Sequence, residues 1–381
     1  MRTFTVRSVQ CKVEWAADSA VFGYGYSPSI PEPSAIARDI LVDVMQLRRF
    51  SGSQTSCITS PCQKCLAPHL SKIISAVALG LPVTFVLPAF PGKSPNPAKV
   101  LGPLPDMAER RALEFLQQLC DRVRRYYSPG ARVILCSDGR VFSDVVGMHD
   151  EDVTAYRHEL FKMIVELGLS SISTFNLDEL YDGLSFDQMR AQLMEQHGVP
   201  IDALQAAVRR GGTNQDCSPY SSEDDQEAHR LYCGITRFLL EDAMFPGQKK
   251  SRTALQKDCR NRAYEVIQRS KAWGDLVEMR FPNAVRLSIH PQACGAKKLG
   301  IRLIEPDNWL TPWHGVAVEV GGRFMLLKRS QAEELGASLV HRDGRPSHYV
   351  LPLGSDVEKE LSKLHLTGAK HGTSPEVQNE A

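Results

Sequence analysis

Apolar positions between residues 70 and 130 follow two alternating periods. The run "LSKIISAVALG" (70–80) has helical spacing and ends at a glycine, whereas "VTFVL" (83–87) is a continuous apolar run of strand length. In 106–127 the apolar residues again recur at helical intervals, behind Asp106 and Glu109 in capping-box spacing. These patterns predict a helix, a buried strand and a second helix.

The alternation continues through the next fifty residues. "ARVILCSDG" (131–139) and "SISTF" (171–175) have the composition of buried strands, and 152–167 has helical spacing between them. An alternating order of strands and helices indicates an α/β protein whose parallel sheet carries helices on both faces. The sequence therefore predicts a Rossmann-like fold.

The remainder of the chain changes character twice. A largely helical segment is followed by strands, which include a hairpin with a Gly321-Gly322 turn. The last residues are polar and are expected to be disordered. The predicted division is an N-terminal segment with a Cys/His cluster (1–69), the α/β core (70–184), a helical segment (185–283), C-terminal strands that complete the site (284–365) and a disordered tail (366–381).

Composition limits the classes of partner. The 381 residues include 45 basic and 44 acidic ones, which leaves a net charge of +1 and no global attraction to nucleic acid or to a membrane surface. We find no apolar run of about 18 residues and no signal-peptide pattern at the start. The expectation is a cytoplasmic protein with no nucleic-acid or membrane partner, in which any anion-binding site is local.

The stretch "LPAFPGKSPNPAKVLGPLPD" (87–106) follows the first predicted strand, at the edge where parallel sheets bind ligands. It contains "GKS", but a phosphate-binding P-loop needs a glycine where this chain has Leu87, and six prolines remove amide donors. A stiff loop is therefore predicted that presents four polar side chains: Lys93, Ser94, Asn96 and Lys99. The alternative is a proline-rich linker with solvated lysines.

Four further residues suit proton transfer or amine binding. Asp138 and Asp144 follow the second predicted strand, and either one is a candidate general base or amine ligand, or else a turn former and a helix cap. His290 and His314 stand beside prolines at strand ends, where a structural role is the alternative to proton shuttling.

Basic and polar residues supply candidate phosphate ligands. Arg286 and Ser288 alternate with apolar neighbours and so share a face with His290. The loop "FPGQKKSR" offers Lys250 and Arg252, although a solvated basic loop explains them equally well. Arg237 lies among apolar residues of a predicted helix and is a further candidate ligand.

Only one group of the ten cysteines is clustered. "CITSPCQKCLAPH" contains Cys57, Cys62, Cys65 and His69, a set of four zinc ligands by residue type. The two hypotheses are a structural zinc site and reduced cysteines without a metal.

Several blocks together resemble a known family. "LPAFPGKSPNPAKVLGPLPD", "PGARVILCSDGRVFSDVVGMHDEDV", "RFLLEDAMF", "AYEVIQRSKAWGDLVEMRFPNAVRLSIHPQ" and "WLTPWHGVAVE" are similar, in order, to the blocks of the isocyanide (isonitrile) synthases, also described as pyoverdine/dityrosine biosynthesis proteins. The resemblance runs from about residue 57 to residue 330.

The resemblance implies a Rossmann-like fold and a distinctive reaction. The amino group of an L-amino acid, such as tyrosine, tryptophan or an aliphatic one, becomes an isonitrile whose carbon comes from ribulose 5-phosphate. The implied steps are imine formation, phosphate elimination and carbon–carbon cleavage, with no redox cofactor and no ATP. Some members are instead associated with an N-formyl product, and a non-catalytic phosphosugar binder is the third hypothesis.

This chemistry gives provisional roles to the residues above. Lys93, Lys250, Arg252 and Arg286 are candidates for phosphate, and Asp138, His290 and His314 for proton transfer. Lys93 is alternatively a candidate for a transient Schiff base with the ketose. Because the resemblance takes up most of the chain, we expect a separate tailoring enzyme to process the product.

Overall fold

The computed structural model describes residues 32–51, 57, 60–212, 222–307 and 309–352, and the central feature of this part is a five-stranded sheet. All neighbouring strands are parallel, in the order β3-β2-β1-β4-β5. The strands are β1 (Val83–Leu87), β2 (Ala131–Cys136), β3 (Ile172–Phe175), β4 (Val285–Ser288) and β5 (Leu299–Gly300). The Rossmann-like α/β fold predicted from the sequence is confirmed.

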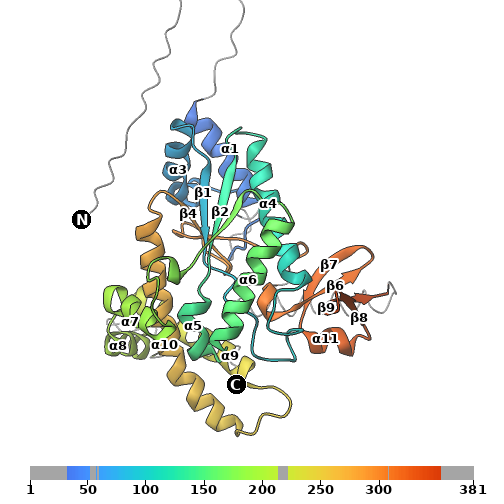
Figure 1. The fold of residues 1–381 in the computed structure, drawn as a ribbon. Helices are drawn as coiled ribbons and strands as arrows, with labels where there is room; N and C mark the ends of the chain where they lie inside the picture. Colours follow the sequence, from blue (N-terminus) through green and yellow to red (C-terminus); the bar gives the residue numbers. More distant parts are fainter. Residues whose placement is uncertain (1–31, 52–56, 58–59, 213–221, 308, 353–381) are drawn as a thin grey trace, which may run out of the picture. The chain divides into compact units, whose positions relative to one another are not determined.

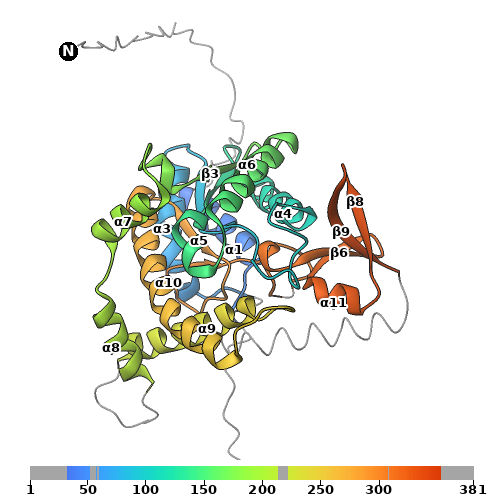
Figure 2. The same cartoon turned by 60° about the horizontal axis from the view of Figure 1, so that its bottom comes forward.

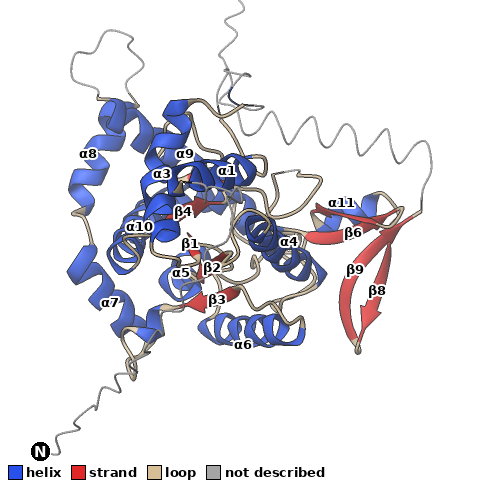
Figure 3. Cartoon of the chain, turned by 90° about the horizontal axis from the view of Figure 1, so that it is seen from above, coloured by secondary structure: helices blue, strands red, loops and turns tan. Residues whose placement is uncertain are grey.

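Successive residues of each strand point to opposite faces, so the sheet has two separate cores. Phe85, Val133 and Val285 pair across β1, β2 and β4 and face the helices α1, α3, α4 and α6. Val86 and Ile134 point the other way, toward α5, α7 and α10. Figure 3 shows these two groups of helices on opposite sides of the strands.

The helices on the first face are α1 (Pro33–Met45), α3 (Gln63–Ala78), α4 (Met107–Arg124) and α6 (Asp150–Glu166). Helix α4 begins with the predicted capping box of Asp106 and Glu109. Helix α3 begins at Gln63 with Pro68 inside it, earlier than the helix expected from residue 70. The boundary that we predicted between residues 69 and 70 thus falls within this helix.

The opposite face and the helical segment comprise α5 (Gly139–Val146), α7 (Phe186–His197), α8 (Ile201–Gly211), α9 (Glu223–Ala243) and α10 (Arg252–Arg280). Helix α10 is long and packs against α5, α7 and α9. Figures 1 and 2 show α9 and the start of α10 near α5, the helix that follows β2. Helix α9 and the start of α10 therefore lie near the carboxyl edge of the sheet, where the strands end.

A second, four-stranded sheet lies beside α4, in the order β7-β6-β9-β8. Its elements are β6 (Val316–Val320), β7 (Arg323–Leu327), β8 (Ser338–Arg342) and β9 (Arg345–Leu351), with α11 (Arg329–Glu334) between β7 and β8. The predicted hairpin is confirmed: β6 and β7 are antiparallel, and Gly321 and Gly322 take positive φ angles of 57° and 79°. Short 3-10 turns are formed by Leu177–Glu179 (η1) and Pro312–His314 (η2).

Two predictions about the ends of the chain lie outside the described residues: the N-terminal part of segment 1–69 and the disordered tail 366–381. Among the described helices, none combines the length and the apolar composition required to cross a bilayer.

Candidate functional site

The carboxyl edge of the central sheet brings together two charged groups from β2 and β4, the strands that flank β1. Arg286 pairs with Val86 of β1, so its side chain belongs to the face that packs against α10. Asp138 precedes α5 directly after β2 and lies close enough to Arg286 for their charges to interact. The Nη1 of Arg286 donates to the Gly274 carbonyl of α10 at 3.3 Å. Buried Oδ1 of Asp138 and buried Nε of Arg286 have no protein partner among the described residues.

These two groups differ from ordinary surface charges in their electrostatics. Burial raises the pKa of Asp138 to about 7, against the opposing effect of Arg286. Burial lowers the pKa of Arg286, while nearby anionic groups, including Asp138, act in the opposite direction. A carboxyl group that exchanges its proton near neutral pH, beside an incompletely bonded guanidinium, is a candidate general base next to a candidate anion site.

The loop between β4 and β5 adds two side chains to this edge. Burial by the surrounding protein lowers the pKa of His290 to about 4, and the positive charges of Arg49 and Lys298 lower it further, although the ring reaches solvent. Burial and the charge of Arg286 lower the pKa of Lys298. We call Asp138, Arg286, His290 and Lys298 the rim group; Lys298 was missed by the sequence analysis, which had no signal to separate it from other surface lysines.

The proline-rich loop (residues 88–105) is fixed tightly against this edge. Ser137 Oγ donates to the Phe90 carbonyl at 2.9 Å. A Cβ on Gly139 would lie 1.8 Å from the Pro91 oxygen, so only glycine permits this approach of loop to helix. The predicted stiff loop at the carboxyl edge thus has a structural basis.

Lys93 lies inside this loop structure rather than on its surface. Its Nζ is 2.9 Å from Asp106 Oδ2, 2.8 Å from Glu109 Oε2 and 3.0 Å from the Pro312 oxygen, and its side chain is 0% exposed. Burial alone would lower the pKa of Lys93, but the two carboxylates raise it above its ordinary value. A charged, fully bonded ammonium is not a nucleophile, and this position differs from the phosphate contact expected from the sequence.

Three other polar residues of the loop contact α9. Ser94 Oγ and Lys99 Nζ lie 2.8 Å and 2.6 Å from Asp242 Oδ1. Asn96 Nδ2 donates to the Glu241 carbonyl at 2.9 Å, near the end of the helix. These side chains, which we predicted as substrate ligands, are already bonded within the protein.

His314 stands between this network and solvent. Its Nδ1 is 2.9 Å from Thr311 Oγ1, its Nε2 is 3.8 Å from Asp242 Oδ2, and its side chain is 23% exposed. Burial lowers its pKa to about 4 although Asp242 raises it, so the ring is neutral near pH 7. A neutral, partly exposed imidazole retains the capacity for proton transfer.

We call the bonded set of Lys93, Ser94, Lys99, Asp106, Glu109 and Asp242 the loop network. It joins the proline-rich loop to α4 and α9. The sequence analysis named only the three loop residues as site candidates. It assigned Asp106 and Glu109 to a helix cap and did not single out Asp242.

The other predicted ligands are placed as follows. Asp144 forms two hydrogen bonds to Arg269 of α10, at 2.6 and 3.0 Å, and so connects α5 to α10. Lys250 and Arg252 are exposed at the turn between α9 and α10, and Arg237 is exposed on α9. Ser288 Oγ accepts from the His290 amide at 3.1 Å and thereby shapes the loop of the rim group.

A cavity of about 300 Å³ lies on another side of the proline-rich loop. It is lined by that loop, by the connection from α5 to α6 and by Arg329. Its lining does not include Asp138, Arg286 or His290. Arg329 is paired with Glu333 at 2.8 Å, so we regard the rim group as the better candidate site.

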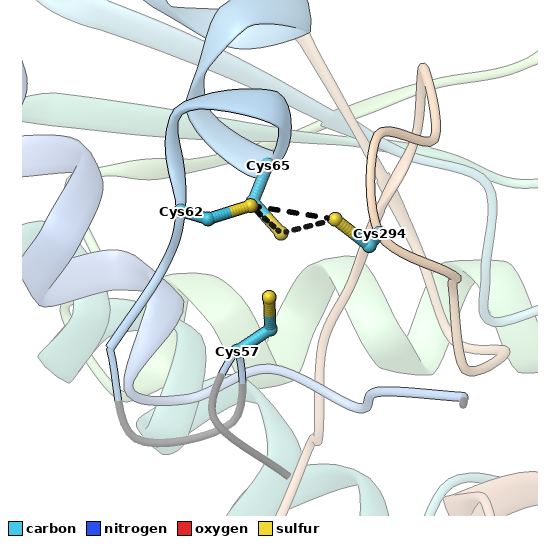
Figure 4. Close-up of side chains that lie close together, drawn as sticks. All are labelled: Cys57, Cys62, Cys65 and Cys294. Atoms are coloured by element: carbon cyan, nitrogen blue, oxygen red, sulfur yellow. Dashed lines mark hydrogen bonds between the residues drawn. The ribbon is translucent and has the colours of Figure 1, made fainter. Parts of the chain in front are cut away.

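The cysteine cluster has a different fourth member from the one predicted. The Sγ atoms of Cys57, Cys62, Cys65 and Cys294 all lie within 4.8 Å of one another (Figure 4). His69 does not belong to this group: it is 2% exposed on α3, and burial lowers its pKa to about 4. Hydrogen bonds, first from the Cys65 amide and then from Cys294, lower the pKa of Cys62 to about 6.

The fold is that of a Rossmann-like α/β protein, and the rim group is its candidate acid–base and cationic site. Residues 73–340 match the family model described as "Pyoverdine/dityrosine biosynthesis protein". The chain is also 44% identical to an L-tryptophan isonitrile synthase of Fischerella ambigua, over 83% of this chain and 95% of that protein.

Two further comparisons agree. An L-tyrosine isonitrile synthase of Pseudomonas aeruginosa is 46% identical, over 74% of this chain and 84% of that protein. The crystal structure of the PvcA protein from Pseudomonas aeruginosa matches with a TM-score of 0.74 and 42% identity, over 83% of this chain and 100% of that chain. The chain belongs to the isocyanide synthase family of pyoverdine/dityrosine biosynthesis proteins, as the motif blocks predicted.

Proposed function

We propose that this protein is an isonitrile synthase that acts on an aromatic L-amino acid and takes the isonitrile carbon from ribulose 5-phosphate. The relatives above are named for tryptophan and tyrosine, which supports the aromatic class of substrate. The observation that carries the proposal is the proximity of Asp138 and Arg286 at the carboxyl edge, where the charge of each affects the pKa of the other. Each also has a buried polar atom that has no hydrogen-bond partner among the described residues.

The first chemical requirement is a neutral amine. An ammonium group cannot attack a ketone, so a base must remove its proton before an imine forms. Asp138, with a pKa of about 7, is suited to accept that proton near neutral pH. We therefore assign to it the role of general base.

The second requirement is positive charge around a phosphate. Arg286 of β4 and Lys298 before β5 lie close enough to one another that the positive charge of Arg286, after burial, lowers the pKa of Lys298. A doubly charged phosphate bound there would relieve this repulsion and receive charge-assisted hydrogen bonds. In the proposal these two residues hold the ketose phosphate.

Later steps need proton transfers at the sugar hydroxyl groups. His290 at the rim and His314 beside Asp242 are neutral imidazoles near pH 7, and each reaches solvent in part. We assign proton transfer to them and a positioning role to Lys93, whose bonds hold the loop to the start of α4 and to the Pro312 carbonyl near His314. Elimination of phosphate and cleavage of a carbon–carbon bond would complete the reaction.

The experiment is incubation of the purified protein with an amino acid and ribulose 5-phosphate labelled at the keto carbon, followed by mass spectrometry. The proposal expects labelled product from L-tryptophan or L-tyrosine, heavier than the substrate by one carbon and lighter by two hydrogens. A formyl increment would assign the protein to the N-formylating reaction instead. Absence of any product with the whole panel of aromatic and aliphatic amino acids would contradict the proposal, and an Asp138→Asn variant provides the background.

A further inference from the structure

We infer that Cys57, Cys62, Cys65 and Cys294 bind a structural Zn²⁺ ion that ties helix α3 to the loop between β4 and β5. The four sulfur atoms come from three separate segments of the chain, and Figure 4 shows them pointing toward one centre. Cys62 and Cys65 have the CxxC spacing typical of zinc sites, whereas Cys294 is 229 residues beyond Cys65. This inference does not depend on the proposed reaction.

The separations between the sulfur atoms fit a tetrahedral ion. Three of them are 3.3 Å for Cys65–Cys294, 3.5 Å for Cys62–Cys294 and 3.8 Å for Cys62–Cys65, and Cys57 Sγ lies within 4.8 Å of each of the other sulfur atoms. Four sulfurs at about 2.3 Å from one zinc ion lie about 3.8 Å from each other. A disulfide requires about 2.0 Å, and a polynuclear iron–sulfur cluster requires room for sulfide ions between the ligands. The spacing therefore favours one ion bound by four thiolates.

Two of the four sulfur atoms lie at the start of a helix, where negative charge is favoured. Cys62 caps α3 and Cys65 lies in its first turn, where the amide groups and the helix dipole stabilise anionic sulfur. Lys64 lies between these two ligands, and its side chain covers Gly295: a Cβ there would be 2.9 Å from Lys64 Cε. Four thiolates on Zn²⁺ carry a net charge of about −2, and the basic residue Lys64 adjoins Cys65 in the sequence.

The position of the cluster indicates what a bound ion would do: it would fix the loop between β4 and β5. Cys294 lies in the loop that carries His290 and Lys298 of the rim group. The other side of this loop is held by the chain around Arg49: the Gln292 amide donates to the Arg49 carbonyl at 3.2 Å, and the Ser51 amide donates to the Gln292 carbonyl at 3.1 Å. Zinc bound through Cys294 would attach the loop to α3 as well, so the loop would be held at two points.

The test is metal analysis of the full chain, purified without chelator under reducing conditions. We expect about one zinc ion per chain, and X-ray absorption of the same sample should show four sulfur ligands and no imidazole. Cys294→Ser and Cys62→Ser should lower zinc affinity about tenfold or more. Cys120→Ala, which removes a buried cysteine of α4 away from the cluster, is the matched control and should keep its zinc.

His69 separates this ligand set from the one suggested by sequence spacing. A His69→Gln variant should retain zinc, and loss of zinc from this variant with retention in Cys294→Ser would overturn the proposal. So would a reduced wild-type protein that neither contains zinc nor takes it up, or that holds iron in its place. Because X-ray absorption on wild-type protein reports the ligands directly, the inference stays testable if a variant fails to fold.

Discussion

The rim group and the loop network contain similar charged residues but differ in how fully those residues are bonded. In the loop network, Lys93 has two carboxylates and a carbonyl within 3.0 Å, and its side chain is 0% exposed. In the rim group, Asp138 and Arg286 each retain a buried polar atom without a protein partner among the described residues. The lysines of the loop network are held in ion pairs of 2.6 to 2.9 Å, whereas Asp138 and Arg286 form no ion pair among the described residues, and this difference separates the candidate site from its support.

The comparison predicts the largest effect on activity for Asp138. Asp138→Asn should lower kcat/KM by about 10²- to 10⁴-fold because the amide cannot accept the amine proton. In the wild type, kcat/KM should rise with pH through about 7, where Asp138 loses its proton, and this rise should be absent from the variant. The measurement is the pH profile of product formation.

Stability is the control for this variant. The folded-state pKa of Asp138 is raised above its usual value, so ionisation of Asp138 makes folding less favourable as pH increases toward and through about 7. At pH 8 the variant should accordingly be at least as stable as the wild type. An active Asp138→Asn protein with an unchanged pH profile would remove Asp138 from the mechanism.

For Lys93 we expect the largest effect on stability. Lys93→Met leaves Asp106 and Glu109 buried without their cation, and the free energy of unfolding should fall by about 3–5 kcal/mol in denaturant titrations. Arg110→Met breaks a partly exposed pair with Glu114 on the same helix and should cost less than about 1 kcal/mol. A Lys93→Met protein that is stable but inactive would assign Lys93 to the chemistry rather than to the loop network.

Arg286 should affect substrate binding more than folding. Arg286→Gln removes a charged donor from the proposed phosphate site and should raise KM for the ketose phosphate about 10- to 100-fold. Arg132→Gln, at the other end of the same sheet, where Arg132 contacts Thr84, should leave KM unchanged. Equal KM values in the two variants would contradict the assignment of the phosphate site to Arg286 of β4.

The smallest effect should come from the basic turn between α9 and α10. Lys250 and Arg252 are exposed, so the double variant to alanine should change stability by less than about 0.5 kcal/mol and KM by less than about twofold. A much larger rise in KM for the ketose phosphate would bring this turn into the site.

The sequence by itself determined the order of strands and helices in the core, the β6–β7 hairpin and the family. Each of these depends on local patterns: an apolar run, a capping box, a pair of glycines in a turn. Strands β8 and β9 lie within the predicted segment of C-terminal strands (284–365), but their bounds were not predicted; most of β8 is exposed and shows no apolar face. The alternation of Arg286 with apolar neighbours, which places its side chain on one face of the sheet, was also predicted from the sequence.

Only the tertiary structure decided which charges have partners. Ser94 and Lys99 meet Asp242 across 148 and 143 residues of sequence, and Cys294 joins Cys65 across 229. No local pattern encodes such contacts, because they arise when separate elements pack together and the chain must bond every polar group that packing buries. Lys99, for example, was a candidate substrate ligand by sequence, and its contact with Asp242 makes it part of the loop network instead.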